Sequence, residues 1–234
     1  MKSRYNLWKK QLIVFGAQLY LRGRSIQIGG DTVIDVSAGH ILYPLFAVRQ
    51  FFKEIIIIEC NDQCIKGVRN WIDNDPGAHD WSYASKALKE IENASESYQD
   101  IEAMTRRKMK RIEKCDLAKK NPTSPVELPK ADCVICFRTL DGVSPDRNAF
   151  RRNLKNLSSL LKAGGNLVLL ADIGTSYLMV GDDKFFVLDY DESFLTQVLK
   201  DEGYTIKCYE KVGGESTSDL YALKKAILVV AEKQ

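Results

Sequence analysis

Short apolar runs rich in valine and isoleucine alternate along the chain with longer amphipathic stretches. This alternation is typical of βαβ units and of a largely parallel sheet, so we expect an α/β fold. The run at 55–59 is continuously branched and apolar, which predicts a central strand covered on both faces. The predicted strands are residues 32–36, 55–59, 132–137, 166–171, 204–210 and 225–232.

Helical periodicity fills most of the segments between these strands. The predicted helices are residues 41–52, 62–73, 79–94, 99–114, 148–162 and 192–201, with a further amphipathic helix within 1–23. A turn at 181–183 predicts a hairpin over 177–188, and the prolines within 121–129 indicate a loop. The sequence contains no internal repeat and no interdomain linker, so we expect residues 1–234 to form one domain.

Composition and charge exclude several classes of partner. The net charge is only +3, and the basic stretch 106–114 is flanked by acidic residues, which indicates a solvated helical face rather than a nucleic-acid site. No apolar run approaches the roughly 20 residues that a membrane span needs. The start lacks the cleavage site of a signal peptide, and the six cysteines suit reduced thiols. We expect a soluble, cytoplasmic monomer that binds neither nucleic acid nor membrane.

Candidate chemistry lies at three strand ends, because ligands of doubly wound sheets bind beyond the carboxyl ends of the strands. The first strand is followed by the small-residue turn 37–40, the second ends in Glu59, and a third ends before Cys115-Asp116-Leu117. A tight turn followed by an acid that can accept ribose hydroxyls indicates an adenosine ligand. Glu59 alone does not separate a nicotinamide dinucleotide from S-adenosylmethionine, and it is also compatible with a plain solvated acid. No G-x-G-x-x-G follows the first strand, which disfavours the dinucleotide.

Several other candidate functional residues allow two interpretations. Cys133 and Cys136 have metal-like spacing, but positions three apart in a strand face opposite ways, so we expect no metal site. Asp141 either orients a substrate amine or caps the next helix. Tyr177, in the hairpin, either stacks on a flat substrate or belongs to the rim of the core. His40, at a predicted helix start, either caps that helix or contacts cofactor or substrate. His79 also lies near a helix start, and we expect it to be structural.

From about residue 30 to its end, the chain resembles the nicotinamide, indolethylamine and phenylethanolamine N-methyltransferase family. The resemblance rests on long motifs in a common order: VIDVSAGHILYPL, FKEIIIIECNDQC, HDWS, KCDL, LPKADCVICFRTLD, NLSSLLKAGGNLVLLAD, SYLMVGDDKF and GYTI. It implies a class I methyltransferase fold, a doubly wound seven-stranded and mostly parallel sheet with the last strand antiparallel. It also implies an enzyme that uses S-adenosylmethionine to methylate a small amine or pyridine-type substrate.

The resemblance assigns roles to positions of this chain. Residues matching the family's cofactor contacts are Ser37, Gly39 and Tyr43 for the methionine part, Glu59 for the ribose, Asp116 with the Leu117 backbone for the adenine, and Cys64 and Phe137. Asp172 matches the acid that contacts substrate, and we predict it as the residue that holds the acceptor and acts in catalysis. The predicted substrate pocket further includes Tyr177, Leu178 and Val187.

The chain also departs from the family pattern. In the cofactor site, the family has glycine at Ser37, asparagine at Cys64 and threonine at Phe137. On the substrate side it has tyrosine at Leu178 and serine at Val187, so we expect a more apolar substrate pocket. The family's N-terminal lid with paired tyrosines has no clear counterpart, and we expect it to be absent from this sequence. A non-catalytic relative that keeps the fold as a binding or interaction protein is the alternative that these departures leave open.

Overall fold

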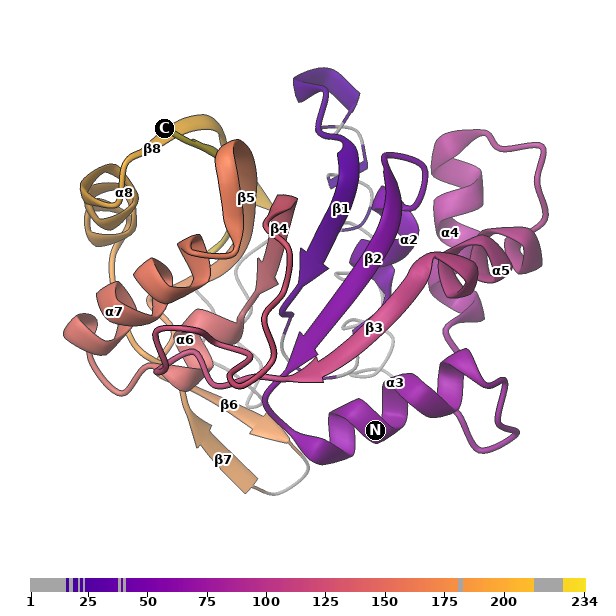
Figure 1. Cartoon of the computed structure of the whole chain (residues 1–234), viewed down its shortest axis with the longest axis horizontal. Coiled ribbons are helices and arrows are strands. Elements are labelled where there is room, and N and C mark those ends of the chain that lie inside the picture. Colours follow the sequence, from indigo (N-terminus) through magenta and orange to yellow (C-terminus); the bar gives the residue numbers. More distant parts are fainter. Residues whose placement is uncertain are drawn as a thin grey trace.

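The computed structural model describes residues 16, 19, 20, 22, 24–37, 39, 41–180, 183–212 and 225–234. Within them a sheet is covered by helices on both faces, and a separate hairpin lies at the end of the sheet where the parallel strands finish (Figure 1). The sheet strands are β1 (Gly30–Asp35), β2 (Phe52–Glu59), β3 (Met109–Lys114), β4 (Ala131–Phe137), β5 (Leu161–Ile173), β8 (Tyr204–Val212) and β9 (Lys225–Lys233). The hairpin is β6 (Tyr177–Val180) and β7 (Asp183–Phe186). The helices are α2 (Tyr43–Val48), α3 (Asp62–Ile72), α4 (Ser82–Glu92), α5 (Tyr98–Lys108), α6 (Thr139–Val143), α7 (Arg147–Ser158) and α8 (Glu192–Asp201).

The seven strands follow the order β3-β2-β1-β4-β5-β9-β8. Pairs among β1 to β5 are parallel, whereas β9 runs antiparallel to both β5 and β8. The predicted seven-stranded sheet with an antiparallel last strand is therefore confirmed. The strand order reverses between β1 and β4, so the crevice beyond their carboxyl ends is where such a fold binds ligands.

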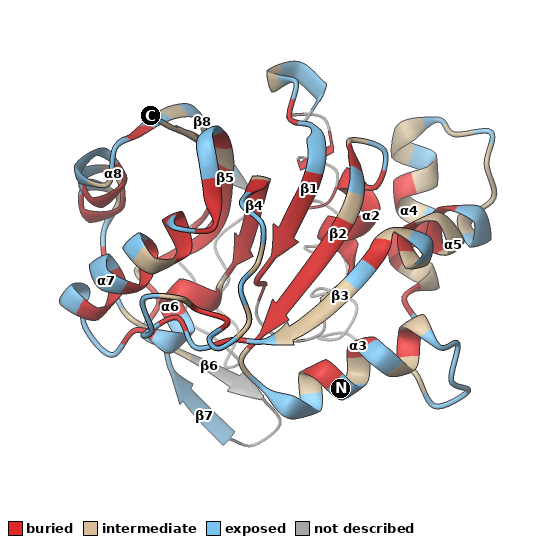
Figure 2. Cartoon of the chain, viewed as in Figure 1, coloured by how far each residue is buried: buried red, intermediate tan, exposed pale blue. Residues whose placement is uncertain are grey.

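The sheet separates two apolar cores because alternate strand residues face opposite ways. Ile55 and Ile57 pack with α2, α3, α4 and α5, whereas Ile56 and Ile58 pack with α6, α7 and α8. Figure 2 shows the buried positions concentrated on the central strands and on the inner faces of the helices. The predicted central position of this isoleucine run is confirmed by its burial on both faces.

Side-chain caps define where several helices begin. The Asn61 side chain accepts hydrogen bonds from the backbone of Gln63 and Cys64 at the start of α3. Asp146 and Asp191 cap α7 and α8 in the same way. Each of these caps satisfies backbone N–H groups that have no partner within the helix. The cap at Asn61 begins α3 immediately after the candidate ligand site at the end of β2.

The predicted helix over 99–114 is wrong in its second half. The helix α5 ends at Lys108, and residues 109–114 form β3, which pairs in parallel with β2. The charged sequence of β3 suits an edge strand, where one side of the ladder faces solvent. The predicted helix over 148–162 is also too long, because α7 ends at Ser158 and Leu161 already belongs to β5.

The basic stretch 106–114 is thereby divided between a helix end and an edge strand, and it is not the single helical face that was predicted. Several of its charges have partners within the fold. Arg106 lies over the Trp71 ring at 3.9 Å and pairs with Glu102, and Lys114 pairs with Asp62. Within the described residues, no helix is long and apolar enough to cross a bilayer.

Candidate functional site

The turn after β1 forms the first part of the site. Ser37 donates a hydrogen bond to Asp35 at 2.6 Å, and both residues are buried. Burial raises the pKa of Asp35 to about 7, although the Ser37 hydroxyl favours its charged form. Gly39 has φ +76°, a conformation that favours glycine, and no atom of the described residues lies within 4 Å of a Cβ built there. The backbone at Gly39 therefore borders a space that none of the described residues fills, called the open space below.

Glu59 connects this turn to the end of β2. Its carboxylate accepts hydrogen bonds from the backbone N–H groups of Asn61, at 2.9 Å, Cys60 and Gly39. Burial raises the pKa of Glu59, and these three donors oppose that rise. The loop after β1 and the acid ending β2 thus lie against each other, as the predicted adenosine site requires.

Asp116 and Leu117 follow β3 on the same edge of the sheet. Asp116 is exposed and accepts a hydrogen bond from the Ala118 backbone at 3.0 Å. Leu117 is buried, and its carbonyl accepts a hydrogen bond from Asn156 on α7. Cys64, in the first turn of α3, is half-buried. A carboxylate open to solvent beside an apolar side chain suits an adenine edge and face.

Tyr43 and Phe137 belong to the core on one face of the sheet, whereas Leu117 belongs to the core on the opposite face. Their ring centroids are 6.0 Å apart, with a tilt of 49° between the planes. Both are buried, Phe137 fully so. The structure thus brings the two residues into contact with each other, within the core that also contains α2.

Asp172, near the end of β5, is held by a cation that sequence reasoning missed. The Arg138 Nε lies 3.0 Å from Asp172 Oδ2, and both side chains are mostly buried. Burial raises the pKa of Asp172, and Arg138 opposes that rise. The other carboxylate oxygen, Oδ1, is buried and has no hydrogen-bond partner among the described residues. Arg138 has φ +63°, and no sequence signal marks a non-glycine residue for that conformation.

Asp141 connects Asp172 to the segment after the hairpin. It accepts hydrogen bonds from the Asp172 backbone and the Tyr190 hydroxyl, and its own carbonyl accepts the Leu188 N–H at 3.0 Å. Asp141 is buried, and burial raises its pKa to about 7. It lies inside α6, and Asp146 is the residue that caps α7, so the proposed capping role of Asp141 is wrong.

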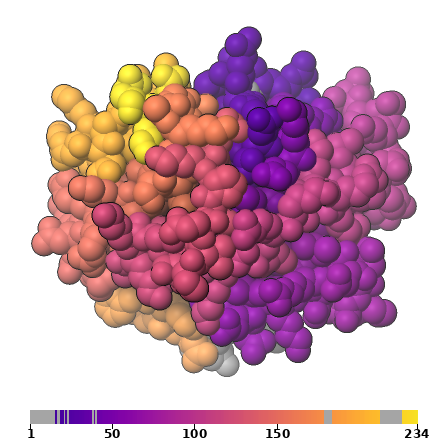
Figure 3. All heavy atoms as spheres, viewed as in Figure 1, coloured from indigo at the N-terminus to yellow at the C-terminus, as the bar shows by residue number. Residues whose placement is uncertain are grey.

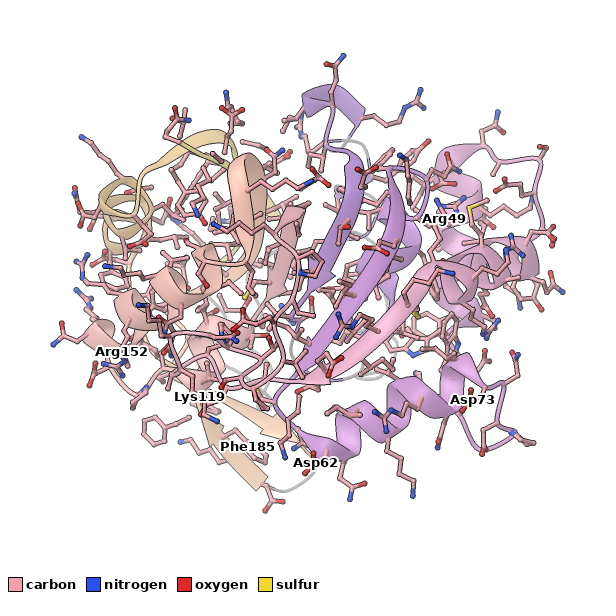
Figure 4. The ribbon with its side chains drawn as sticks, in the orientation of Figure 1. Arg49, Asp62, Asp73, Lys119, Arg152 and Phe185 are labelled. Atoms are coloured by element: carbon pink, nitrogen blue, oxygen red, sulfur yellow. The ribbon has the colours of Figure 1, made fainter. Side chains whose placement is uncertain are left out.

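The hairpin contributes the remaining predicted substrate residues. Tyr177 is half-buried with the Lys184 ammonium 4.1 Å from its ring centroid, and Leu178 pairs through its backbone with Phe185. Val187 is buried, and its N–H donates to Ser176. Figure 4 shows Phe185, on β7, and Asp62, at the start of α3, at the same edge of the molecule, where the parallel strands end.

The other histidine and cysteine candidates lie elsewhere. The His79 ring contacts Trp81, with ring centroids 4.8 Å apart, just before α4. Cys133 and Cys136 belong to opposite cores, as the strand periodicity predicted. Among the described residues, no three His, Cys, Asp or Glu side chains are grouped to hold a metal ion. His40 and most of the predicted N-terminal helix lie outside the described residues.

The described residues fit an adenosine-type cofactor at the ends of β1, β2 and β3. The fit rests on the open space at Gly39, the buried Glu59 carboxylate beside it and the exposed Asp116. In Figure 3, the segment between β3 and β4 crosses the face of the molecule that is turned toward the viewer. The two acids are separated along the sequence but meet at one edge because β2 and β3 are parallel neighbours.

A family model described as the NNMT/PNMT/TEMT family matches residues 3–234. The chain belongs to this family. Nicotinamide N-methyltransferase of Homo sapiens is 32% identical over 206 residues, which are 88% of this chain and 78% of that protein. Indolethylamine N-methyltransferase of Mus musculus is 32% identical over 86% of this chain and 76% of its own length. Phenylethanolamine N-methyltransferase of Homo sapiens is 29% identical, with shares of 86% and 70%.

Solved structures of methyltransferases share the fold. An S-adenosylmethionine-dependent methyltransferase from Clostridium acetobutylicum has a TM-score of 0.59 at 11% identity and covers 93% of this chain and 90% of its own. The glycopeptide N-methyltransferase MtfA, complexed with S-adenosyl-L-homocysteine, has a TM-score of 0.59 at 10% identity, with shares of 93% and 89%. The predicted methyltransferase fold and family are confirmed, and the match to named N-methyltransferases does not favour the non-catalytic alternative.

Proposed function

We propose that the chain is an S-adenosylmethionine-dependent N-methyltransferase that acts on a small amine or pyridine-type acceptor. The observation that carries this proposal is the contact between the Gly39 backbone and the Glu59 carboxylate, beside open space at the carboxyl ends of β1 and β2. The family match supports the same reaction, because its relatives are named for nicotinamide, indolethylamine and phenylethanolamine.

The cofactor is S-adenosylmethionine, and when bound it supplies an electrophilic methyl group to the acceptor nitrogen. Glu59 accepts the ribose hydroxyls, since its carboxylate already lies at the end of β2 with one face toward the Gly39 turn. Asp116 accepts from the adenine amine, and the Leu117 side chain and backbone border the base. Ser37, Gly39 and Tyr43 border the methionine part, with Cys64 and Phe137 as further contacts.

Asp172 holds the acceptor. Among the described residues its buried Oδ1 has no hydrogen-bond partner, which makes it a candidate acceptor for an N–H group of an amine or amide. Arg138 compensates the negative charge of Asp172 from the other side. A site with a compensated charge favours an acceptor nitrogen that is not protonated, and that form carries the lone pair that methylation requires. The hairpin residues Tyr177, Leu178 and Val187 border the acceptor.

Catalysis then depends mainly on positioning. The residues above orient the acceptor and exclude water, and no protein nucleophile is required. Asp172 is held in place from two directions, by Arg138 at its side chain and by Asp141 at its backbone N–H. This arrangement limits the movement of the acceptor relative to the ends of β4 and β5.

A panel of primary amines, secondary amines and pyridines, incubated with methyl-labelled cofactor, tests the proposal. We expect label to transfer to at least one acceptor class, with transfer reduced in Asp172→Asn. Asp201→Asn is the matched control, because Asp201 is an exposed acid at the end of α8. Transfer to no member of the panel, with cofactor bound, would refute the proposed reaction, and equal transfer by both variants would remove Asp172 from it.

A further inference from the structure

Two cysteines lie side by side at the edge where the candidate cofactor site is built. Cys60 follows the last residue of β2, and Cys115 follows the last residue of β3. Glu59 pairs with Lys114 in the parallel register, and the Cys115 N–H donates to the Glu59 carbonyl at 3.0 Å. Cys60 and Cys115 are therefore the next opposed pair of these neighbouring strands.

The two sulfur atoms are 3.1 Å apart, with Cys115 buried and Cys60 half-buried. Neighbouring strands lie about 4.8 Å apart, which is within the Cα separation of about 4.4–6.8 Å that a disulfide tolerates. A bond of about 2.05 Å thus needs the sulfurs to approach by only about 1 Å. Cys133 and Cys136, by contrast, face opposite cores and cannot pair with each other.

Cys60 also contacts both halves of the candidate adenosine site. Its sulfur accepts a hydrogen bond from the Leu117 N–H, and its own N–H donates to the Glu59 carboxylate. A change in the position or bonding of this sulfur is therefore transmitted to the ribose acid and to the adenine-binding backbone.

The environment distinguishes the two thiols chemically. The hydrogen bond with Cys115 lowers the pKa of Cys60, although burial and the carboxylates Glu59 and Asp116 oppose this. The same hydrogen bond and burial raise the pKa of Cys115 far above that of an ordinary thiol. Because the thiolate is the reactive form and Cys60 is the more accessible residue, Cys60 is the thiol that reacts first.

We propose that Cys60 and Cys115 form a redox-active dithiol, which a low-molecular-weight disulfide of the glutathione type converts to a protein disulfide that weakens cofactor binding. The effect on binding rests on the proposed function, whereas the formation of the disulfide does not. The Cys60 thiolate attacks one sulfur of the small disulfide and releases the first small thiol. The Cys115 thiol then loses its proton to solvent and attacks Cys60, releasing the second small thiol. Two protein thiols are oxidised, and one small disulfide is reduced to two thiols.

The disulfide displaces the Cys60 sulfur, which accepts the Leu117 N–H, and moves the ends of β2 and β3 toward each other. Losing one hydrogen bond of ordinary strength corresponds to about 2- to 10-fold weaker binding. A reductant such as dithiothreitol restores both thiols, and we expect it to restore the affinity.

The full-length chain, treated with oxidised glutathione and digested without reduction, tests the proposal by peptide mass spectrometry. We expect a peptide pair linked through Cys60 and Cys115, and we expect calorimetry with S-adenosylhomocysteine to give 2- to 10-fold weaker binding by the oxidised chain. In Cys115→Ser, Cys60 should retain a mixed disulfide with glutathione, because the resolving thiol is missing. In Cys60→Ser, the buried Cys115 should stay unmodified.

Cys208→Ser is the matched control, since Cys208 is half-buried on β8, at the far edge of the sheet. It should form the Cys60–Cys115 disulfide as the parent does. A glutathione adduct on the parent without the linked peptides would overturn the dithiol, and linked peptides with unchanged affinity would overturn its effect on the site. If the reduced parent does not bind S-adenosylhomocysteine, the proposed function fails. The peptide mapping then still shows whether Cys60 and Cys115 form a disulfide.

Discussion

Substitution of Glu59 gives the sharpest test of the proposed cofactor site. Its carboxylate is buried at the end of β2, accepts three backbone N–H groups and borders the open space at Gly39. Replacing it in Glu59→Ala removes the charged acceptor for the ribose hydroxyls. Hydrogen bonds to charged groups contribute about 1.5–3 kcal/mol each. We therefore expect the dissociation constant for S-adenosylhomocysteine to rise roughly 10- to 150-fold.

The same substitution leaves the N–H groups of Asn61, Cys60 and Gly39 without this acceptor, so thermal unfolding has to be measured beside binding. Glu59→Gln separates the two effects, because its carbonyl oxygen still accepts the Asn61 N–H while the charge is lost. We expect Glu59→Gln to fold like the parent and to bind the ligand with an affinity between those of the parent and Glu59→Ala.

Isothermal titration calorimetry on the parent and both variants gives the dissociation constants directly. Asp62→Asn is the control, because Asp62 is an exposed acid three residues further on that pairs with Lys114. Its affinity should match that of the parent within about twofold. A folded Glu59→Ala variant that binds as tightly as the parent would show that Glu59 does not hold the ribose.

Three further predictions concern catalysis, pH and the core. Asp172→Asn should lower kcat/KM roughly 10- to 100-fold while changing cofactor affinity less than twofold, as measured by label transfer and calorimetry; an unchanged kcat/KM would contradict the acceptor role. Because burial raises the pKa of Asp141 to about 7, the folded chain binds its proton more tightly than the unfolded chain, so stability should fall as the pH rises from about 4 to 7. In Asp141→Asn, the free energy of unfolding measured with denaturant should fall by roughly 2–4 kcal/mol less over this pH range than in the parent. A pH profile parallel to that of the parent would contradict this assignment. Leu228→Ala, in the centre of β9 and fully buried, should lose about 2–5 kcal/mol of unfolding free energy by the same assay, and a loss below 1 kcal/mol would contradict its place in the core.

The parts of the fold that sequence reasoning predicts well are those where local pattern and tertiary environment agree. The isoleucine run in β2 is apolar on both faces because helices cover both faces of the sheet. The helix α8 ends shortly before Gly203, which has φ +81° and suits the left-handed turn after a helix. In both cases the residue type itself carries the information.

The edge strand β3 could not be predicted in the same way. Its sequence, MKRIEK, carries charges that equally suit the continuation of α5, and only pairing with β2 makes it a strand. Local propensity is a weak signal when a neighbouring strand offers a complete ladder of hydrogen bonds.

The candidate site shows the same division. The segment before Asp116 was predicted as part of a helix, so the pattern gave no firm place for that residue. Glu59 ends a predicted strand, and its place at the carboxyl ends of the parallel strands could be expected from the α/β pattern. The pairing of Arg138 with Asp172 could not, because it joins residues 34 positions apart through a left-handed backbone conformation at Arg138. Contacts of this kind depend on the tertiary fold, and no periodicity in the sequence encodes them.

A crystal structure of the chain with S-adenosylhomocysteine tests the central claim most directly. We predict the ribose hydroxyls within hydrogen-bond distance of the Glu59 carboxylate, the adenine amine at Asp116, and the homocysteine part along the Gly39 turn. Ligand bound elsewhere on the chain, or in this crevice without contact to Glu59 and Asp116, would contradict the account.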